Sequence, residues 1–156
     1  MADVQEGAPA PDFELMSDTE GLIRLSDLRG KKVVLYFYPK DNTPGCTQEG
    51  KDFSELLDEF EKADTVVIGI SPDDEKKHAK FREKHGLKVI LAADPERKAI
   101  EAYGVWKEKS MYGRKYFGVE RSTFLIDREG NIARVWRKVR VKGHAREVLD
   151  AARALP

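Results

Sequence analysis

The strongest constraint on the fold is the run KVVLYFYP at 32–39, which a short loop separates from an amphipathic segment. A nearly continuous series of β-branched and aromatic residues is typical of a strand that is buried on both faces. Further along, apolar residues recur with the spacing of a helix that buries one face, at Phe53, Leu56, Leu57 and Phe60. A strand covered on both sides needs elements packed above and below it, so the pattern indicates an α/β protein.

The rest of the chain continues this alternation. We expect further strands at 65–71 and 88–94, and helices at 74–85 and 97–103. A segment rich in Lys, Tyr and Gly follows, which we expect to be a loop. The turn DREGN joins two strands at 121–127 and 131–137, and a helix at 143–155 ends the chain. Together with a hairpin from 12–15 and 22–25 and a turn at 26–31, this predicts a mixed sheet flanked by helices, with an N-terminal extension.

Composition excludes several classes of partner. The chain has 156 residues, within the usual size of one domain, and we expect a single domain over 1–156. Its 28 basic and 28 acidic residues cancel, so no overall field attracts nucleic acid or anionic membranes. No apolar run approaches the ~20 residues of a membrane span, and the first dozen residues lack the features of a signal peptide. We therefore expect a cytoplasmic protein without a membrane contact.

One basic stretch, RVWRKVRVKGHAR at 134–146, could be a nucleic-acid surface. However, Val139 and Val141 alternate with Arg140 and Lys142, as in a half-buried strand with a solvated face. We favour the solvated strand. The histidines His78, His85 and His144 are far from a metal-ligand spacing, so we expect solvated or packing side chains, no metal and no cofactor.

The only cysteine, Cys46, lies where the central strand leads into the helix. Thr43 is a plausible N-cap and Pro44 suits the first helical position, which places Cys46 in the first turn. Unpaired N–H groups and the helix dipole favour a thiolate there. Free cysteines are also common core residues. Because residues 48–50, counted back from Phe53, are not apolar, we expect Cys46 to lie off the buried stripe, exposed and reactive.

The segment from Pro39 to Cys46, PKDNTPGC, resembles the active-site pattern of peroxiredoxins: a proline, three residues, threonine or serine, two residues and cysteine. YFYPKDNTPGCT is similar in particular to the bacterioferritin-comigratory, or Q-type, peroxiredoxins. The similarity extends through GISPDDEKKHAKF, YGVWKEKSMYGRKYFGVERSTFLID and VRVKGHA, nearly the whole chain. It implies a thioredoxin-like fold and reduction of hydrogen peroxide or organic hydroperoxides by Cys46, which becomes a sulfenic acid.

The resemblance also implies roles for other residues. Thr43 would hold the peroxide, Pro39 would shield the sulfenate from water, Arg121 would be the catalytic arginine and Glu49 would help to orient it. A thiol with a pKa of about 8.5 gains at most roughly 30-fold in thiolate at pH 7 from complete ionisation. A fast peroxidase therefore also needs fixed donors for the departing oxygen, such as Arg121, the Thr43 hydroxyl and the N–H groups of Gly45 and Cys46.

The chain departs from many Q-type members because it has no second, resolving cysteine. Lys51 stands five residues after Cys46, and Arg82 stands near the other position where such a cysteine occurs. We therefore expect a one-cysteine peroxidase that is reduced by an external thiol, such as thioredoxin, glutaredoxin or a small thiol, or by the thiol of another subunit. The resemblance implies a monomer or weak dimer. Over-oxidation at high peroxide is expected.

Two other functions remain open. A thiol-disulfide oxidoreductase of thioredoxin type is disfavoured, because Glu49 occupies the place of the second cysteine in a Cys-x-x-Cys pair. The other is a thioredoxin-fold binding or holdase-like module without turnover.

Overall fold

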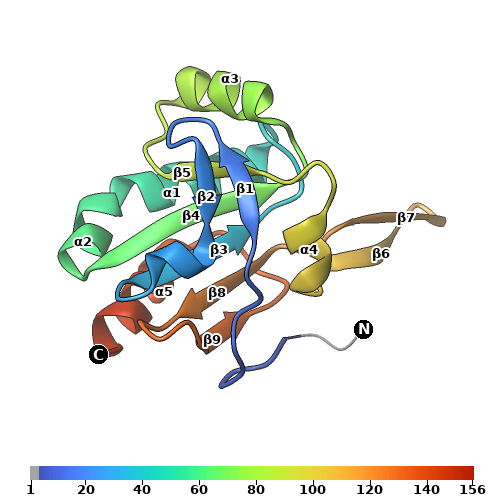
Figure 1. The fold of residues 1–156 in the computed structure, drawn as a ribbon. Coiled ribbons are helices and arrows are strands. Elements are labelled where there is room, and N and C mark those ends of the chain that lie inside the picture. Colours follow the sequence, from blue (N-terminus) through green and yellow to red (C-terminus); the bar gives the residue numbers. More distant parts are fainter. Residues whose placement is uncertain (1–3) are drawn as a thin grey trace.

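The computed structural model of the chain, which describes residues 4–156, contains a seven-stranded mixed sheet (Figure 1). Residues 1–3, which belong to the N-terminal segment that lacks the features of a signal peptide, lie outside the described residues. The strands, in their order across the sheet, are β2 (Leu22–Arg24), β1 (Glu14–Ser17), β5 (Ile90–Ala93), β4 (Thr65–Ser71), β3 (Lys32–Phe37), β8 (Ser122–Ile126) and β9 (Ile132–Trp136). The three strands β3, β4 and β5 are parallel, and the flanking strands pair with their neighbours antiparallel.

The central strand β3 is buried along its whole length, as the apolar run predicts. Alternate side chains enter two separate apolar clusters, because successive residues of a strand point to opposite faces. Val34 and Tyr36 pack with residues of α1 (Pro44–Glu55), α2 (Leu57–Lys62), α3 (Glu75–His85) and α5 (His144–Ala154). Val33 and Leu35 pack with residues of α4 (Lys98–Ala102) and of the N-terminal strands.

The predicted thioredoxin-like α/β fold, with its N-terminal pair of strands, is confirmed. Two local details differ. The segment predicted as a turn after β2 contains a short 3₁₀ helix, η1 (Leu25–Leu28). The helix predicted through Phe60 is interrupted at Leu56, whose ψ of 2° departs from helical values, so that α1 and α2 are separate helices.

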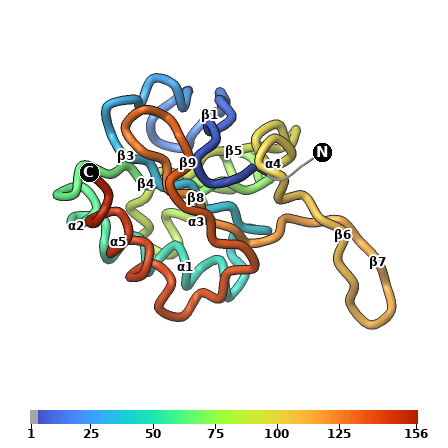
Figure 2. Tube along the Cα trace, turned by 90° about the horizontal axis from the view of Figure 1, so that it is seen from below, coloured from blue at the N-terminus to red at the C-terminus, as the bar shows by residue number. Residues whose placement is uncertain are grey.

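The segment expected to be a loop is a second sheet, formed by β6 (Trp106–Met111) and β7 (Arg114–Val119). Figure 2 shows this hairpin projecting from the body of the molecule. Its turn residues, Tyr112 and Gly113, both have positive φ, 53° and 77°, as in the tight turns that match the twist of paired strands. The loop prediction was wrong because β6 is mostly polar and lacks the usual β-branched residues.

The basic segment after β9 is not the predicted strand. Val139 and Val141 are half-buried and their neighbours exposed, as the alternation predicts, but residues 137–143 have no ladder partner. Lys138 has a φ of 50°, which is incompatible with an extended strand. The Val139 N–H instead donates to the Arg121 carbonyl at 3.0 Å, so this segment supports the backbone in front of β8.

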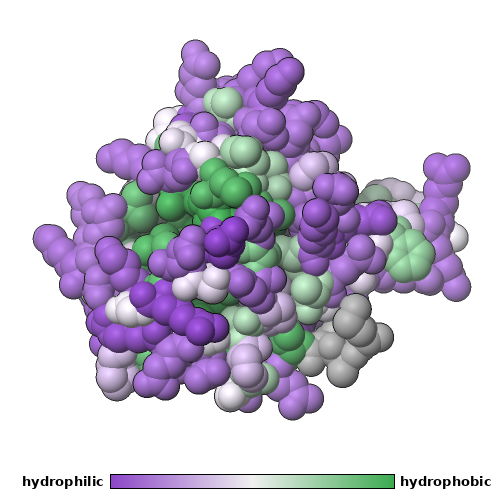
Figure 3. Space-filling view, viewed as in Figure 1, coloured by the Kyte–Doolittle hydropathy of each residue, from purple (hydrophilic) through white to green (hydrophobic). Residues whose placement is uncertain are grey.

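The surface in Figure 3 is largely polar, with apolar side chains gathered near its middle, over β1, β2, β4 and β5. A groove of about 580 Å³ includes Leu57, Val66 and Ile90 among its lining residues, together with charged side chains of both signs. Within residues 4–156, no helix has the length and apolar character that crossing a membrane requires.

Candidate active site

The first turn of α1 is built from local sequence signals. Thr43 has extended φ and ψ of −91° and 155° at the N-cap position, Pro44 begins the helix, and the Thr47 N–H donates to the Thr43 carbonyl at 2.9 Å. The Thr43 side chain does not cap the helix, however. Its Oγ1 donates to the carbonyl oxygen of Lys40 at 2.8 Å, which leaves the lone pairs of the hydroxyl available to accept a hydrogen bond.

Cys46 is buried, with only 2 % of its surface exposed, so the expectation that it is exposed and off the apolar stripe was wrong. It lies in the same cluster as Tyr36, Tyr38 and Phe53. Cys46 is seven residues, about two turns, before Phe53 and therefore shares its face. The face was missed because Glu49 and Gly50, which continue it, are buried without being apolar. Burial keeps the sulfur away from bulk solvent.

Arg121 contacts both Cys46 and Glu49. Its Nη2 donates to the Cys46 Sγ at 3.3 Å, and its Nη1 donates to Glu49 Oε1 at 2.6 Å. The arginine immediately precedes β8, which pairs with β3, so the sheet brings it next to α1 although it is 75 residues from Cys46. One rigid guanidinium thus faces a sulfur with one arm and a carboxylate with the other.

Gly45 makes room for this contact. A Cβ atom built on Gly45 would lie 3.1 Å from Arg121 Nη2, closer than most real Cβ contacts. The absence of a side chain therefore lets the guanidinium approach the helix start.

Burial affects the pKa values of the two partners Glu49 and Arg121 differently. Burial raises the pKa of Glu49 to about 7, although the positive charge and hydrogen bond of Arg121 act to lower it. Burial acts to lower the pKa of Arg121, but the negative charges of Glu49 and of the Cys46 sulfur raise it. Within residues 4–156, Glu49 Oε2 has no hydrogen-bond partner. The carboxylate therefore holds Arg121 by a single oxygen.

Pro39 and Lys109 are known by their places in the chain and by their surroundings. Pro39 is half-buried in the loop that follows β3, between the buried Tyr38 and the exposed Lys40. Lys109, on β6, was not identified from the sequence. Burial, followed by the positive charge of Arg121, lowers the pKa of Lys109, so the projecting hairpin adds a second positive charge near Arg121 and Cys46. Its position depends on the hairpin that the sequence analysis missed.

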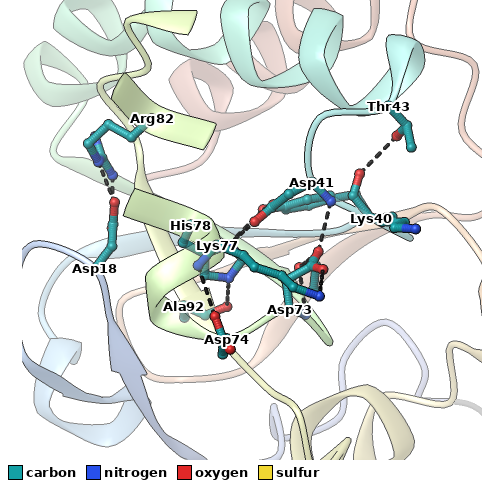
Figure 4. A network of polar contacts seen from close by, with 12 residues as sticks. Asp18, Lys40, Asp41, Thr43, Asp73, Asp74, Lys77, His78, Arg82 and Ala92 are labelled. Atoms are coloured by element: carbon teal, nitrogen blue, oxygen red, sulfur yellow. Dashed lines mark hydrogen bonds and ion pairs between the residues drawn. The ribbon is translucent and has the colours of Figure 1, made fainter. Parts of the chain in front are cut away.

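Two histidines that we expected to be solvated or packing residues are buried and hydrogen-bonded. His144 Nε2 lies 2.8 Å from Thr123 Oγ1, and burial lowers its pKa to about 4. His78 is wholly buried and contacts Asp41 in the loop before Cys46, in the network of Figure 4. The sequence offered only weak indications of this contact: an acidic residue inside the active-site motif and a histidine three positions before the buried Phe81. No cluster of three potential metal ligands occurs within residues 4–156.

Comparison with known proteins agrees with this geometry. The AhpC/TSA family matches residues 7–135 of the chain. The chain, in which an arginine just before β8 contacts a cysteine in the first turn of α1 of a thioredoxin-like fold, thus belongs to the peroxiredoxins, which are thiol-dependent peroxidases. The chain is 52 % identical over 147 residues to peroxiredoxin Bcp of Bacillus subtilis, covering 94 % of each protein.

Solved structures of peroxiredoxins resemble this chain in sequence and in fold. A mutant of Xanthomonas campestris peroxiredoxin Q is 43 % identical with a TM-score of 0.90, over 98 % of this chain and 99 % of that one. The bacterioferritin comigratory protein of the same organism, described for its alkyl peroxide reduction activity, is 42 % identical with a TM-score of 0.89, over 96 % and 98 % of the two chains. The chain belongs to the Bcp, or Q-type, peroxiredoxins.

Cysteine-to-serine mutants of the Xanthomonas campestris protein exist for two cysteines. These two cysteines are separated by the same number of residues as Cys46 and Arg82 in this chain.

Proposed function

We propose that this protein reduces hydrogen peroxide and organic hydroperoxides by a one-cysteine mechanism at Cys46. The contact between Arg121 Nη2 and the Cys46 Sγ, at 3.3 Å, is the observation that carries the proposal. A guanidinium beside a helix N-terminus provides fixed positive charge and N–H donors where negative charge moves from sulfur to oxygen. The alkyl peroxide activity described for the relative extends the proposal to organic hydroperoxides.

In the oxidative step, the Cys46 thiolate attacks one peroxide oxygen and the O–O bond breaks. The sulfur gains that oxygen as a sulfenic acid, and the other oxygen leaves as water or an alcohol after taking up a proton. Arg121 and the N–H groups of Gly45 and Cys46 stabilise the charge on the oxygens. Thr43, whose own proton is donated to Lys40, accepts a hydrogen bond from the peroxide. Pro39 shields the sulfenate, and Glu49 orients Arg121.

In the reductive step, an external thiol attacks the sulfenic sulfur, water leaves and a mixed disulfide forms. A second thiol then releases Cys46 and carries away the oxidised disulfide. An internal disulfide cannot form because Cys46 is the only cysteine. Arg82, at the spacing of the relative's second cysteine, binds Asp18 and the carbonyls of Leu87 and Val89. At this position of α3 the chain thus has an arginine that stabilises the fold through these contacts and no thiol, which supports the one-cysteine assignment.

We propose that the reductant is thioredoxin, glutaredoxin or a small thiol, and that the protein acts as a monomer or weak dimer. Each of these reductants supplies the attacking thiolate that the second step requires.

The test is the mass of the intact protein after one equivalent of hydrogen peroxide in the presence of a sulfenic-acid trap. We expect one trap adduct within seconds, none in Cys46→Ser, and mixed disulfides with the physiological thiol in a panel of reductants. Sulfinic acid should accumulate at high peroxide without a thiol. An adduct as slow as that of a free thiol would overturn the proposal and favour a binding module without turnover.

A further inference from the structure

The loop between β3 and α1 holds Thr43 through one peptide group. The Lys40 carbonyl accepts from Thr43 Oγ1 at 2.8 Å, and the N–H of the same peptide, from Asp41, donates to Asp73 Oδ2 at 2.8 Å. Figure 4 shows these two bonds on opposite sides of the peptide. The direction of the Thr43 hydroxyl proton, and hence of its lone pairs, therefore depends on the orientation of this peptide.

The side chain of Asp41 is fixed at both oxygens. Tyr38 donates its hydroxyl proton to Oδ1 at 2.6 Å, and His78 Nδ1 lies 2.7 Å from Oδ2. The other ring nitrogen of His78, Nε2, lies 3.0 Å from the Ala92 carbonyl, which can only accept a hydrogen bond. Both ring nitrogens therefore face acceptors, and we assign His78 as the imidazolium that donates to Asp41 and to Ala92. The ring is completely buried, so the pair is shielded from water.

The partners of this network belong to the rigid part of the fold. Ser71, at the end of β4, donates to Asp73 Oδ2 at 2.9 Å, and Ala92 lies in β5. Helix α3, which carries His78, begins with an N-cap in which Asp74 accepts from the Lys77 N–H at 2.8 Å. The loop before Cys46 is thus tied to two strands and one helix.

The backbone of this loop is expected to change conformation if the hydrogen bonds of the Asp41 side chain are lost. Asn42 has a φ of 63°, a left-handed conformation that asparagine adopts more readily than other non-glycine residues and that the contacts around the loop hold in place. Its own side chain makes one bond to α3, from Asn42 Oδ1 to His85 Nε2 at 2.7 Å. Without the Asp41 contacts, the loop could relax toward ordinary backbone angles and carry Thr43 with it.

We propose that Asp41 and His78 are positioning residues of the peroxide pocket: they fix the Lys40–Asp41 peptide and thereby aim the Thr43 hydroxyl at the peroxide. This proposal rests on the proposed role of Thr43 in holding the substrate. Neither residue touches the reacting atoms. Their effect is on geometry, and a displacement of about 1 Å in a catalytic group can cost on the order of 100-fold in rate.

The test compares two reactions of Cys46 in Asp41→Ala. Reaction with hydrogen peroxide needs the Thr43 hydroxyl, whereas alkylation by iodoacetamide needs only the sulfur. We expect the second-order rate constant for peroxide to fall at least about tenfold, with the alkylation rate reduced by less than about threefold. A smaller fall with peroxide, or an equal fall in both reactions, would overturn the proposal.

The conservative variant Asp41→Asn should restore the reaction. Its amide oxygen still accepts from Tyr38, and its NH₂ can donate to Nδ1 of a neutral His78 whose Nε2–H still bonds Ala92. We expect a peroxide rate within about threefold of the wild type, because the loop geometry is kept. If Asp41→Asn were as slow as Asp41→Ala, hydrogen bonding by residue 41 would not be what positions the loop.

Two more variants separate positioning from general destabilisation. Tyr103→Phe removes a hydroxyl that donates to the Pro11 carbonyl at 2.7 Å, in the cluster on the other face of the sheet, and should leave the peroxide rate unchanged. Tyr38→Phe removes one bond to Asp41 and keeps the ring, so it tests the proposal if Asp41→Ala does not fold; we expect at least about a threefold fall with peroxide alone. A wild-type protein that fails to react would instead overturn the proposed function.

Discussion

Two buried acid–base pairs lie on either side of Cys46, and they differ in how completely their polar atoms are paired. In the loop before the cysteine, each oxygen of Asp41 accepts a hydrogen bond, from Tyr38 and from His78. One turn after the cysteine, Glu49 uses Oε1 for Arg121, while Oε2 has no partner within residues 4–156. A fully paired network fixes one geometry, whereas an incompletely paired group is typical of a functional site.

The pKa values reflect this difference. Burial acts to lower the pKa of His78, but Asp41, the Ala92 carbonyl and Asp73 together raise it above its ordinary value, which favours the charged imidazolium. For Glu49, burial outweighs Arg121 and raises the pKa to about 7. A buried charge is stabilised only where enough hydrogen bonds replace those to water. Glu49 lacks the second contact, and the Arg121 arm that could have supplied it faces Cys46 instead.

The largest expected effect concerns Glu49 and the dependence of stability on pH. Because its folded pKa of about 7 exceeds the ordinary value of 4.5, the folded state binds the proton more tightly. The contribution of Glu49 is present below pH 4.5 and is lost as the pH rises through 7. Linkage converts this difference to about 3 kcal/mol of unfolding free energy.

Urea unfolding of wild type and Glu49→Gln from pH 4.5 to 8 tests this prediction. The loss should be absent in Glu49→Gln, which keeps a neutral acceptor for Arg121. Any contribution of His78, whose pKa is raised above 6.5, is lost at higher pH and should remain in both proteins. If the unfolding free energy had the same dependence on pH in the two proteins between pH 4.5 and 7, the pKa of Glu49 would not be raised, and the two buried pairs would not differ in this respect.

Arg121→Lys should slow the reaction with peroxide by about 100-fold, which corresponds to about 2.7 kcal/mol in the barrier. A lysine offers one point charge in place of the fork that contacts Glu49 Oε1 and Cys46 Sγ together. Stopped-flow measurement of Cys46 oxidation gives the rate. Arg128→Lys, which changes a partly exposed arginine bonded to Asp64, is the matched control and should react at the wild-type rate. A lysine variant within tenfold of wild type would contradict the importance of the fork.

The smallest expected effect is that of Gly45→Ala. The new Cβ would lie 3.1 Å from Arg121 Nη2, so the guanidinium must move by a few tenths of an ångström, and we expect oxidation of Cys46 to slow about threefold. Gly50→Ala is the matched control, because its Cβ would meet Leu87 side-chain carbons at 3.2 and 3.3 Å, away from Arg121. The same slowing in both variants would indicate a general effect of crowding α1.

Much of the fold could be predicted because its signals are local. The apolar run at 32–39 identifies β3, and the helical spacing from Phe53 identifies the helical segment of α1 and α2, without knowledge of their neighbours. The hairpin β6–β7 was missed because its strands are polar, so that only the Tyr112–Gly113 turn indicated it. The strand predicted around Val139 fails at Lys138, where a positive φ interrupts an otherwise plausible alternation.

The site was only partly predictable. The motif pointed to Cys46 and Arg121, which the structure brings into contact, but the helical period was misjudged, because Glu49 and Gly50 do not look like members of a buried face. The environment of His78 was also missed. Its partner Asp41 is 37 residues away, and no local pattern distinguishes a buried charged histidine from a solvated one.

The sequence by itself determined where most of the strands and helices lie and that the single thiol lies at the start of a helix, since hydrophobic spacing, Thr43 and Pro44 act over a few residues. Only the tertiary structure decided the burial of Cys46, the contact with Arg121 and the unequal pairing of Asp41 and Glu49. Desolvation and hydrogen bonding depend on which distant groups the packed chain places around each atom, and this becomes defined only when the sheet brings β3, β8, α1 and α3 together.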